Sequence, residues 1–333
     1  MNNNILEIRN LCVSYKTYEG RLHVVDDMNL EIRQGEKVGL VGETGCGKTT
    51  TMRSILGILP KPAGSIDNGN IIFGDKDLTM LSAKEMQCVR GRDITAIFQN
   101  PTAALNPVFT IGQQLKDVIK VQVYRKTGNR ISNKAAKERA VQVLKEAALP
   151  DPERLLSNYP VQLSGGMKQR VCIALAMVSN AELLIADEPG TALDVTIQDQ
   201  ILRLLMKSVI KRNTATLYIE HSLGVIREWM DRVYVMYAGR TVEVASTTDL
   251  FKNPLHPYTR GLLAAVPKLT GGGIALGIPG RVPEYLNPPS GCRFHPRCEY
   301  KMDICIKEKP PYFEVGKEHK VACYRSADIE RDS

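Results

Sequence analysis

The stretch Gly42-Glu43-Thr44-Gly45-Cys46-Gly47-Lys48-Thr49 fits the phosphate-loop pattern G-x-x-x-x-G-K-[ST]. It follows a short apolar run, residues 38–41, typical of a buried strand, and precedes a helical pattern over about residues 48–59. Glycines let the backbone wrap closely around phosphates, and successive N–H groups at a helix N-terminus supply positive potential. We therefore expect this loop and Thr50 to bind a nucleotide, with Lys48 on the β- and γ-phosphates and Thr49 on Mg²⁺.

A second apolar run, residues 183–186, ends in two carboxylates, Asp187 and Glu188. Strands of a parallel sheet deliver such residues to the carboxyl edge, where the phosphate loop also lies. We expect Asp187 to hold Mg²⁺ and Glu188 to orient or deprotonate the attacking water. An isolated Asp-Glu pair is commonly only a solvated strand end, but that interpretation is disfavoured downstream of a phosphate loop.

The segment Leu163-Ser164-Gly165-Gly166-Met167-Lys168-Gln169-Arg170 places Ser-Gly-Gly at the start of a helix. Free N–H groups, a serine hydroxyl and the positive end of a helix make a seat for an anion, although an ordinary N-cap has the same pattern in isolation. The segment resembles the signature loop of ATP-binding cassette (ABC) proteins. The other elements of that family occur in family order: Tyr15, the phosphate loop, Gln99, the pair Asp187-Glu188, Ala192-Leu193-Asp194 and His221.

The resemblance implies a role for each of these residues. Tyr15 would stack on adenine, with Tyr18 as a competing candidate. Gln99 would contact Mg²⁺ and sense the γ-phosphate, which His221 would also contact. The loop from Leu163 through Ser164, Gly165 and Gly166 to Met167 would close over the nucleotide of a partner subunit, and Asp194 would belong to the loop at the dimer contact.

Four positions depart from the family pattern. Cys46 replaces the usual Ser, Gly190 replaces a Thr, and Glu220 and Ser222 flank His221 where Thr and Asp are usual. We expect little loss from Cys46, because this position contributes chiefly its backbone N–H. Glu220 places an acid beside the γ-phosphate contact, which could weaken hydrolysis. Because Lys48, Gln99, Asp187, Glu188 and His221 are all present, a competent ATPase is favoured.

The wider pattern predicts an α/β fold. Helices alternate with buried strands from residue 165 onward, which indicates a parallel sheet with covering helices. The resemblance implies that this sheet is the P-loop NTPase (ABC ATPase) core. Residues 5–32 alternate as antiparallel β-structure, and about residues 100–165 form a helical insertion whose two helical patterns lie within 110–149. Proline and glycine become frequent beyond about Leu250, so we expect an ATP-binding domain, residues 1–250, and a small irregular extension, residues 251–333.

The extension narrows the family. His256-Pro257-Tyr258-Thr259-Arg260-Gly261-Leu262-Leu263 and the segment 288–298 resemble the C-terminal extension of ATPases serving oligopeptide, dipeptide and nickel importers. The resemblance implies an ATPase, converting ATP and water to ADP and phosphate, that powers uptake of peptides or a related solute. Its partners would be a second ATPase subunit, two membrane permeases docked near the Gln99 loop and helical insertion, and indirectly an extracytoplasmic solute-binding protein. The chain would lie on the cytoplasmic face of the membrane.

Four cysteines, Cys292, Cys298, Cys305 and Cys323, fall within the last 42 residues and are separated by 5, 6 and 17 residues. This spacing fits neither a zinc ribbon nor a ferredoxin, and four thiolates suit zinc and iron–sulfur equally. In some members of the resembled family the corresponding cysteines hold a 4Fe–4S cluster, which is therefore favoured over Zn²⁺ and over free thiols. His295 and His319 are near enough in sequence to substitute as ligands.

Composition excludes several other classes of protein. With 43% hydrophobic and 24% charged residues, the chain is neither collagenous nor mostly disordered. The longest apolar run, residues 171–186, is broken by Asn180 and Glu182 and falls short of the roughly 18 residues of a membrane span. No secretory signal pattern begins the sequence, so a cytoplasmic protein is expected.

Two rival functions remain open. A net charge of +8 weakly suggests a soluble cassette protein that acts on nucleic acid or ribosomes. Because the charges are scattered and no basic–aromatic patch occurs, we expect no nucleic-acid partner. A non-hydrolysing regulatory subunit is favoured only by Glu220 and Gly190.

Overall fold

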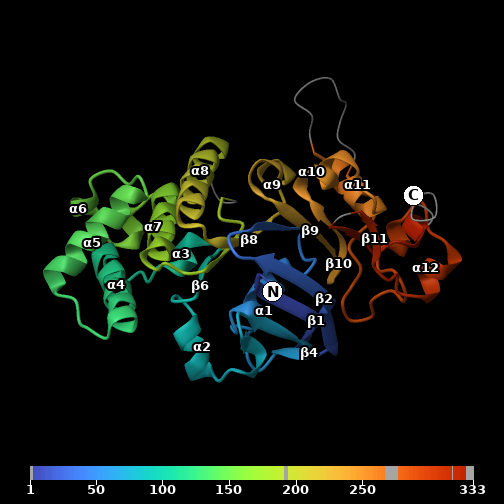
Figure 1. Ribbon diagram of the computed structural model, residues 1–333, viewed down its shortest axis with the longest axis horizontal. Coiled ribbons are helices and arrows are strands. Elements are labelled where there is room, and N and C mark those ends of the chain that lie inside the picture. Colours follow the sequence, from blue (N-terminus) through green and yellow to red (C-terminus); the bar gives the residue numbers. More distant parts are fainter. Residues whose placement is uncertain (1–2, 191–193, 267–276, 317, 328–333) are drawn as a thin grey trace. The chain divides into compact units, whose positions relative to one another are not determined.

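The computed structural model describes residues 3–190, 194–266, 277–316 and 318–327 (Figure 1). By its internal contacts the chain divides into two compact units. The first unit combines the chain up to residue 81 with the chain from residue 218 onward, and the second comprises residues 82–217.

The first unit begins with an antiparallel sheet in the strand order β2-β1-β4-β5. Its strands are β1 (Asn4–Lys16), β2 (Arg21–Arg33), β4 (Gly64–Phe73) and β5 (Lys76–Asp77). In β1 the side chains of Leu6, Ile8, Leu11 and Val13 are all buried, and Val13 lies opposite Val25 of β2. The antiparallel β-structure expected near the N-terminus is confirmed.

A second sheet carries the phosphate loop. Five strands of this eight-stranded sheet lie wholly in the first unit, in the order β11-β12-β10-β9-β3: β11 (Phe313–Gly316), β12 (His319–Val321), β10 (Arg240–Ser246), β9 (Arg232–Tyr237) and β3 (Lys37–Val41). Strands β3 and β9 are parallel, and the other pairs among these five strands are antiparallel. Strand β3 is almost wholly buried and leads through the phosphate loop into α1 (Lys48–Ile55).

The segment beyond residue 250 contains regular structure that joins this sheet. Strand β12 pairs antiparallel with β10, with Val321 opposite Glu243. The helices of this segment are α11 (Pro257–Ala264) and α12 (Asp303–Lys307), with short 3₁₀ segments at His295–Arg297 and Tyr324–Ala327. Helices α9 (Leu223–Trp229) and α10 (Thr247–Lys252) precede it in the same unit. The extension therefore belongs to the same compact unit as the phosphate loop.

The second unit is mainly helical. Its two parallel strands are β6 (Ile94–Ile97) and β7 (Leu183–Asp187), while β8 (Ala215–Glu220) runs through the division between the units. Its helices are α2 (Ala83–Val89), α3 (Pro101–Ala104), α4 (Ile111–Thr127), α5 (Asn133–Glu146), α6 (Pro152–Leu155), α7 (Gly165–Val178) and α8 (Val195–Arg212). Short 3₁₀ segments occur at Leu78–Met80, in the first unit, and at Pro160–Gln162.

The helical insertion is the part of this unit that the sequence pattern predicts in most detail. Helices α4, α5 and α7 pack against one another, the green group in Figure 1. The hydroxyl of Ser132 accepts a hydrogen bond from the N–H of Ala135 at 3.2 Å and caps the N-terminus of α5. Ala136, Ala140, Val143 and Leu144 form the buried face of that helix. In the parts of the chain that the structure describes, no helix has the length and apolarity of a membrane span.

Candidate active site

The phosphate loop has a backbone that only glycine can adopt at two of its positions. Gly47 has φ 111° and is the N-cap of α1. At Gly42 a Cβ atom would overlap the carbonyl oxygen of Met236 in β9. The glycines that defined the sequence pattern are therefore required by the local geometry of the loop.

Lys48 lies across the loop that precedes it. Its side chain is buried, and its Nζ donates hydrogen bonds to the carbonyl oxygens of Gly42 at 2.6 Å and Glu43 at 3.2 Å. Cys46 is also buried, and burial raises the pKa of its thiol. The Cys46 carbonyl accepts a hydrogen bond from the N–H of Gly239 at 2.8 Å. Cys46 thus takes part in the loop through its backbone, with a buried, neutral side chain.

The two candidates for adenine stacking differ in their surroundings. The hydroxyl of Tyr15 lies 3.3 Å from Oγ1 of Thr50 in α1, and the residue is partly buried. Tyr18 is fully exposed in the turn after β1. Tyr15 is therefore the tyrosine that lies beside the helix following the phosphate loop.

His221 follows β8 and is coupled to the acid that precedes it. The carboxylate of Glu220 is fully buried and accepts hydrogen bonds from the N–H groups of His221 at 2.9 Å and Ser222 at 3.2 Å. The same oxygen lies 3.1 Å from Nδ1 of His221, whose side chain is half exposed. Glu220, where the family usually has another residue, thus accepts hydrogen bonds from the backbone of the turn and lies beside the imidazole ring of His221.

In the second unit, the acidic pair contacts the predicted glutamine. Asp187 is buried at the end of β7, and Glu188 has φ 44°, a left-handed conformation that is uncommon for a residue other than glycine. Nε2 of Gln99 donates a hydrogen bond to Oε2 of Glu188 at 2.8 Å. The structure therefore brings together two residues that the sequence places 89 positions apart.

The signature loop forms an exposed helix N-terminus. Ser164 is the N-cap of α7, and its hydroxyl accepts a hydrogen bond from the N–H of Met167 at 3.3 Å. Ser164 and Gly165 are exposed, whereas Leu163 is buried and anchors the segment. At Gly166 a Cβ atom would lie 3.0 Å from Cγ2 of Ile197, so a small residue suits this position.

The segment after the acidic pair is described only in part. Ala192 and Leu193 lie outside the described residues. Asp194 is the N-cap of α8, where its side chain accepts a hydrogen bond from the N–H of Ile197 at 3.0 Å. Gly190 is buried, and a Cβ atom there would overlap the side chain of Gln198. Glycine leaves room for the Gln198 side chain as placed, whereas a Thr here would require that side chain to shift.

The predicted site residues are divided between the two units. The first unit holds Tyr15, residues 42–50 and His221, and the second holds Gln99, residues 163–167, Asp187, Glu188 and Asp194. Within the units the structure brings Tyr15 to Thr50 and Gln99 to Glu188. The binding of one nucleotide by both sets remains a prediction.

The four cysteines of the extension line one cavity, together with His256 and His295. The N–H of Cys292 donates a hydrogen bond to the carbonyl of Cys305 at 2.8 Å. Burial, with a contribution from the neighbouring thiols, raises the pKa of Cys292 to about 11. Among the described residues, no three or more His, Cys, Asp or Glu side chains lie close enough together, as placed, to hold a metal ion.

The two histidines considered as substitute ligands differ. His295 lines the cysteine cavity, and its Nδ1 lies 2.9 Å from the carbonyl oxygen of Cys292. His319 is instead engaged by the buried carboxylate of Glu243, with 2.8 Å between Nε2 and Oε1. Its expected role as an alternative ligand is therefore not supported.

Sequence reasoning missed the contacts between the extension and the phosphate loop. Tyr258, Tyr285 and Arg297 each form a hydrogen bond with Glu43 or Gly45. These partners are separated by 215 to 254 positions in the chain. We find no local sequence signal for contacts at such separations.

Two protein families match the chain. Residues 25–191 match the family described as "ABC transporter", and residues 242–305 match "Oligopeptide/dipeptide transporter, C-terminal region". The oligopeptide transport ATP-binding protein OppD of Bacillus subtilis (strain 168) is 44% identical over 319 residues, covering 95% of this chain and 87% of that protein. The dipeptide transport ATP-binding protein DppD of the same organism is 42% identical over 321 residues, covering 96% of this chain and 94% of that protein.

A solved structure supports the same assignment. The dimeric structure of a post-hydrolysis state of the ATP-binding cassette MJ0796, bound to ADP and Pi, has a TM-score of 0.65 and 26% sequence identity, and the match covers 73% of this chain and 98% of that chain. The α/β ABC ATPase fold expected from the sequence is thus confirmed. The phosphate loop, the signature helix and the extension together show that this chain belongs to the ATP-binding subunits of ABC transporters, in the oligopeptide/dipeptide group.

Proposed function

We propose that this chain hydrolyses ATP to drive the import of peptides or a related solute. The observation that carries the proposal is a phosphate loop with glycine-only geometry, followed on the same chain by an extension of the oligopeptide/dipeptide type. The relatives named as oligopeptide and dipeptide transport ATP-binding proteins match nearly the whole chain.

The residues of the loop and the acidic strand provide the groups that hydrolysis needs. In the proposed mechanism Lys48 offsets charge on the β- and γ-phosphates. Thr49, Gln99 and Asp187 carry hydroxyl, amide and carboxylate oxygens, the ligands that suit Mg²⁺, which would offset the phosphate charge when bound. Mg²⁺ is a hard cation that prefers oxygen ligands, so these three side chains fit it.

Glu188 and His221 act on the reacting groups. Glu188 accepts a proton from the attacking water as the water oxygen bonds to the γ-phosphorus and the bond to the β-phosphate oxygen breaks. His221 donates a hydrogen bond to the γ-phosphate, with its ring held by Glu220. Gln99 orients Glu188 through the hydrogen bond at 2.8 Å.

Transport requires partners. We propose that a second ATPase subunit pairs with this chain, so that residues 163–167 close over the nucleotide of the partner. The exposed N-terminus of α7 supports this role, since free N–H groups and the helix dipole favour a phosphate. Two permease subunits would dock near the Gln99 loop and the helical insertion, holding the chain at the cytoplasmic face of the membrane. A solute-binding protein outside the membrane would deliver the solute to the permeases.

We further propose that Cys292, Cys298, Cys305 and Cys323 hold a metal centre, with a 4Fe–4S cluster favoured over Zn²⁺. The support is that all four thiols line one cavity and that soft thiolates suit both centres. Their present separation means that binding must draw the side chains together and displace their protons. The centre would stabilise the extension and takes no part in the ATPase steps.

The function is tested with the full chain assembled with its ATPase partner and permeases in lipid vesicles. We expect ATP turnover and uptake of labelled peptides by the assembly, with both lost in Lys48→Ala. Turnover stimulated by RNA or ribosomes, without solute uptake, would instead support the rival function.

A further inference from the structure

Three side chains of the extension contact the backbone and side chains of the phosphate loop. They are Tyr258 in α11, Tyr285 in the segment before the cysteines, and Arg297 in the 3₁₀ segment His295–Arg297. All lie in the same compact unit as the loop. The extension thus reaches the candidate site directly.

Arg297 forms a two-pronged ion pair with Glu43. Its Nη1 and Nη2 donate hydrogen bonds to the two carboxylate oxygens of Glu43 at 2.7 and 3.1 Å. The Arg297 side chain is only 4% exposed, and its Nε and Nη2 also donate to the carbonyls of Pro279 and Ile278. A planar guanidinium held at several points fixes the position of its carboxylate partner, so Arg297 restrains the second residue of the loop.

Two tyrosine hydroxyls orient peptide groups of the loop. The hydroxyl of Tyr258 accepts a hydrogen bond from the N–H of Glu43 at 2.8 Å, and the hydroxyl of Tyr285 donates to the carbonyl of Gly45 at 2.6 Å. Because a peptide unit is planar, the second contact also fixes the direction of the N–H of Cys46. The tyrosines therefore determine how two peptide units of the loop are oriented.

Two of these side chains, Tyr258 and Arg297, are buried against an aromatic cluster. Tyr258 is fully buried, and its ring centroid lies 4.6 Å from that of Tyr237, which in turn packs edge-on against Phe294 at 5.0 Å. Arg297 lies over the ring of Tyr237, with 5.6 Å from its guanidinium carbon to the ring centroid. The support for the loop is thus an aromatic cluster shared by β9 and the extension.

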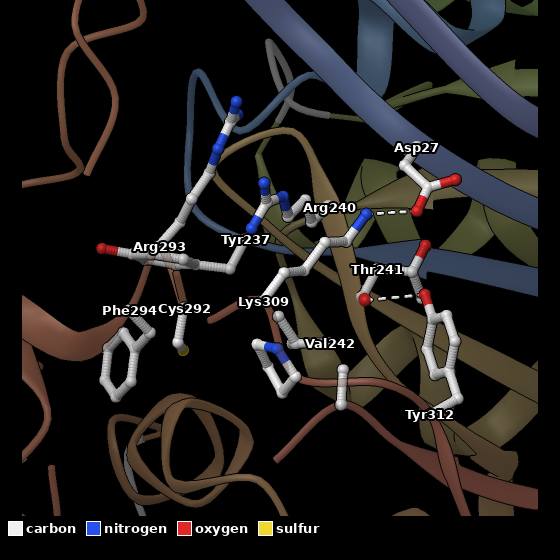
Figure 2. A pocket seen from close by; sticks show the side chains of 12 residues that line it. Asp27, Tyr237, Arg240, Thr241, Val242, Cys292, Arg293, Phe294, Lys309 and Tyr312 are labelled. Carbon is white, nitrogen blue, oxygen red and sulfur yellow. Dashed lines mark hydrogen bonds and ion pairs between the residues drawn. The ribbon is translucent and has the colours of Figure 1, made fainter. Parts of the chain in front are cut away.

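A second route connects the extension to the loop through the turn between β9 and β10. Nη1 of Arg293 donates a hydrogen bond to the carbonyl of Ala238 at 2.5 Å, and the N–H of Gly239 donates to the carbonyl of Cys46 at 2.8 Å. Figure 2 shows Arg293, Tyr237 and Phe294 on one side of the adjoining cavity, with Asp27 and Tyr312 on the other. Arg293 therefore stabilises the turn at Ala238 and Gly239, which is hydrogen-bonded to the backbone of Cys46.

We infer that Tyr258, Tyr285 and Arg297 are positioning residues for nucleotide binding, which hold the phosphate loop in its binding conformation through Glu43 and Gly45. The inference rests on the proposed function, because it takes the phosphates to bind at residues 42–49. A loop that adopts the binding conformation only part of the time binds its ligand more weakly by that fraction. The extension thereby contributes to the affinity for ATP without touching the nucleotide.

The test measures binding of a non-hydrolysable ATP analogue with Mg²⁺ to the full chain by calorimetry. Arg297→Ala is expected to weaken binding about tenfold, since hydrogen bonds to charged groups are among the stronger ones. Tyr285→Phe, which removes one hydroxyl, is expected to weaken it about threefold. Tyr312→Phe is the matched control, because it removes a hydroxyl of the extension that donates to the carbonyl of Thr241 and should leave the affinity unchanged.

A double-mutant comparison separates positioning from general loss of structure. Glu43→Gln is expected to weaken binding in the parent and to have little further effect in Arg297→Ala, because the two side chains act as one unit. In the assembled transporter the variants should raise the KM for ATP while kcat stays within about twofold, since Glu188 and Gln99 are untouched. The melting temperature of each variant shows whether it folds. If Arg297→Ala does not fold, the affinities of Tyr285→Phe and Glu43→Gln test the positioning role.

Two outcomes overturn different claims. Parent affinity in both Tyr285→Phe and Glu43→Gln, with binding lost in Lys48→Ala, would overturn the positioning role and leave the proposed function standing. Parent affinity in Lys48→Ala would show that residues 42–49 do not bind the phosphates, and would overturn the proposed site itself.

Discussion

Nε2 of Gln99 donates a hydrogen bond to Oε2 of Glu188, with 2.8 Å between the two atoms. Glu188 has a left-handed backbone, which is uncommon for a residue other than glycine, and the amide of Gln99 is one contact that holds its carboxylate in place. In the proposed mechanism the residue that senses the γ-phosphate therefore also orients the group that accepts the proton of water. A movement of Gln99 would change the position of that base.

Replacing Glu188 by Gln should separate hydrolysis from binding. Glu188→Gln removes the proton acceptor, so turnover should fall by about 100- to 10,000-fold, the range for a positioned acid–base group. Affinity for ATP should stay within about twofold. Turnover by the assembled transporter and calorimetry of the full chain provide the two measurements. Glu182→Gln, an exposed acid just before β7, is the control, and unchanged turnover in Glu188→Gln would remove this residue from its role.

Ser164→Arg tests whether the signature loop acts on the nucleotide of the partner. The substitution places a bulky cation at the exposed N-terminus of α7, where the γ-phosphate of the partner subunit should approach. We expect transport to be suppressed, while this chain retains its own affinity for ATP. Lost affinity in the isolated chain would show that Ser164 acts on the nucleotide of its own subunit.

Glu220 should matter as a hydrogen-bond acceptor. Glu220→Ala leaves the N–H groups of His221 and Ser222 without this acceptor, so we expect a loss of about 2 kcal/mol in the free energy of unfolding. The imidazole would also lose its support, and turnover should fall about tenfold. Glu220→Gln retains an acceptor oxygen and should preserve most of both quantities in denaturant titration and ATPase assays. Equal damage from Gln and Ala would assign the effect to the negative charge.

The proposed metal centre at the four cysteines can be tested by the colour and the metal content of the purified protein. A cubane cluster on the four thiols should make anaerobically purified protein brown, with absorption at about 400 nm and about four irons per chain. A zinc site would be colourless, because a filled d shell has no such transitions. Cys305→Ser should discharge the metal, while Cys88→Ser, at an exposed cysteine of α2, should retain it. If metal analysis finds neither iron nor zinc, the proposed metal centre is wrong and the four cysteines are free thiols.

Asp26 should make the stability of the first unit dependent on pH. Burial alone would raise the pKa of its carboxyl, but Arg240 and Arg293, together with Lys309, hold the pKa below its ordinary value. Because the pKa of Asp26 is lower in the folded protein than its ordinary value of 3.8, the ionised carboxylate stabilises the fold at pH values above 3.8. This stabilisation is lost as the pH falls through the pKa of the folded protein. Asp26→Asn should therefore lower the free energy of unfolding at pH 7 by about 1 to 3 kcal/mol.

Denaturant titration from pH 7 to pH 2 measures this effect. The difference between the parent and Asp26→Asn should shrink below about pH 4, because the parent carboxyl is then neutral as well. Asp67→Asn breaks an exposed pair with Arg21 and should cost less than about 1 kcal/mol. A difference at Asp26 that persists unchanged at pH 2 would contradict the charge-based explanation.

The parts of the site that the sequence predicts are those set by local chemistry. The phosphate loop follows from the steric demands at Gly42 and Gly47, and the N-cap at Ser164 follows from a side-chain oxygen placed before a helix. Each involves residues only a few positions apart or a backbone that one residue type adopts. Such features can be recognised from a single sequence.

The remaining features depend on contacts between distant segments. The contact between Tyr285 and Gly45 joins residues 240 positions apart, and nothing around Tyr285 distinguishes it from an ordinary surface tyrosine. The crowding of four cysteines within the last 42 residues suggested a shared site, and the structure places them around one cavity. The contact between the carboxylate of Glu243 and the imidazole ring of His319 had no local signal. Three-dimensional packing, rather than spacing, determines which of these side chains meet.

The pairing of β12 with β10 has a practical consequence for shortening the chain. Ending it near residue 250, where proline and glycine become frequent, would remove the partner of Glu243 and Val244 in β10. The strand would then present unpaired N–H and C=O groups, a template for intermolecular β-pairing. We therefore expect a chain shortened in this way to aggregate more readily than the full chain.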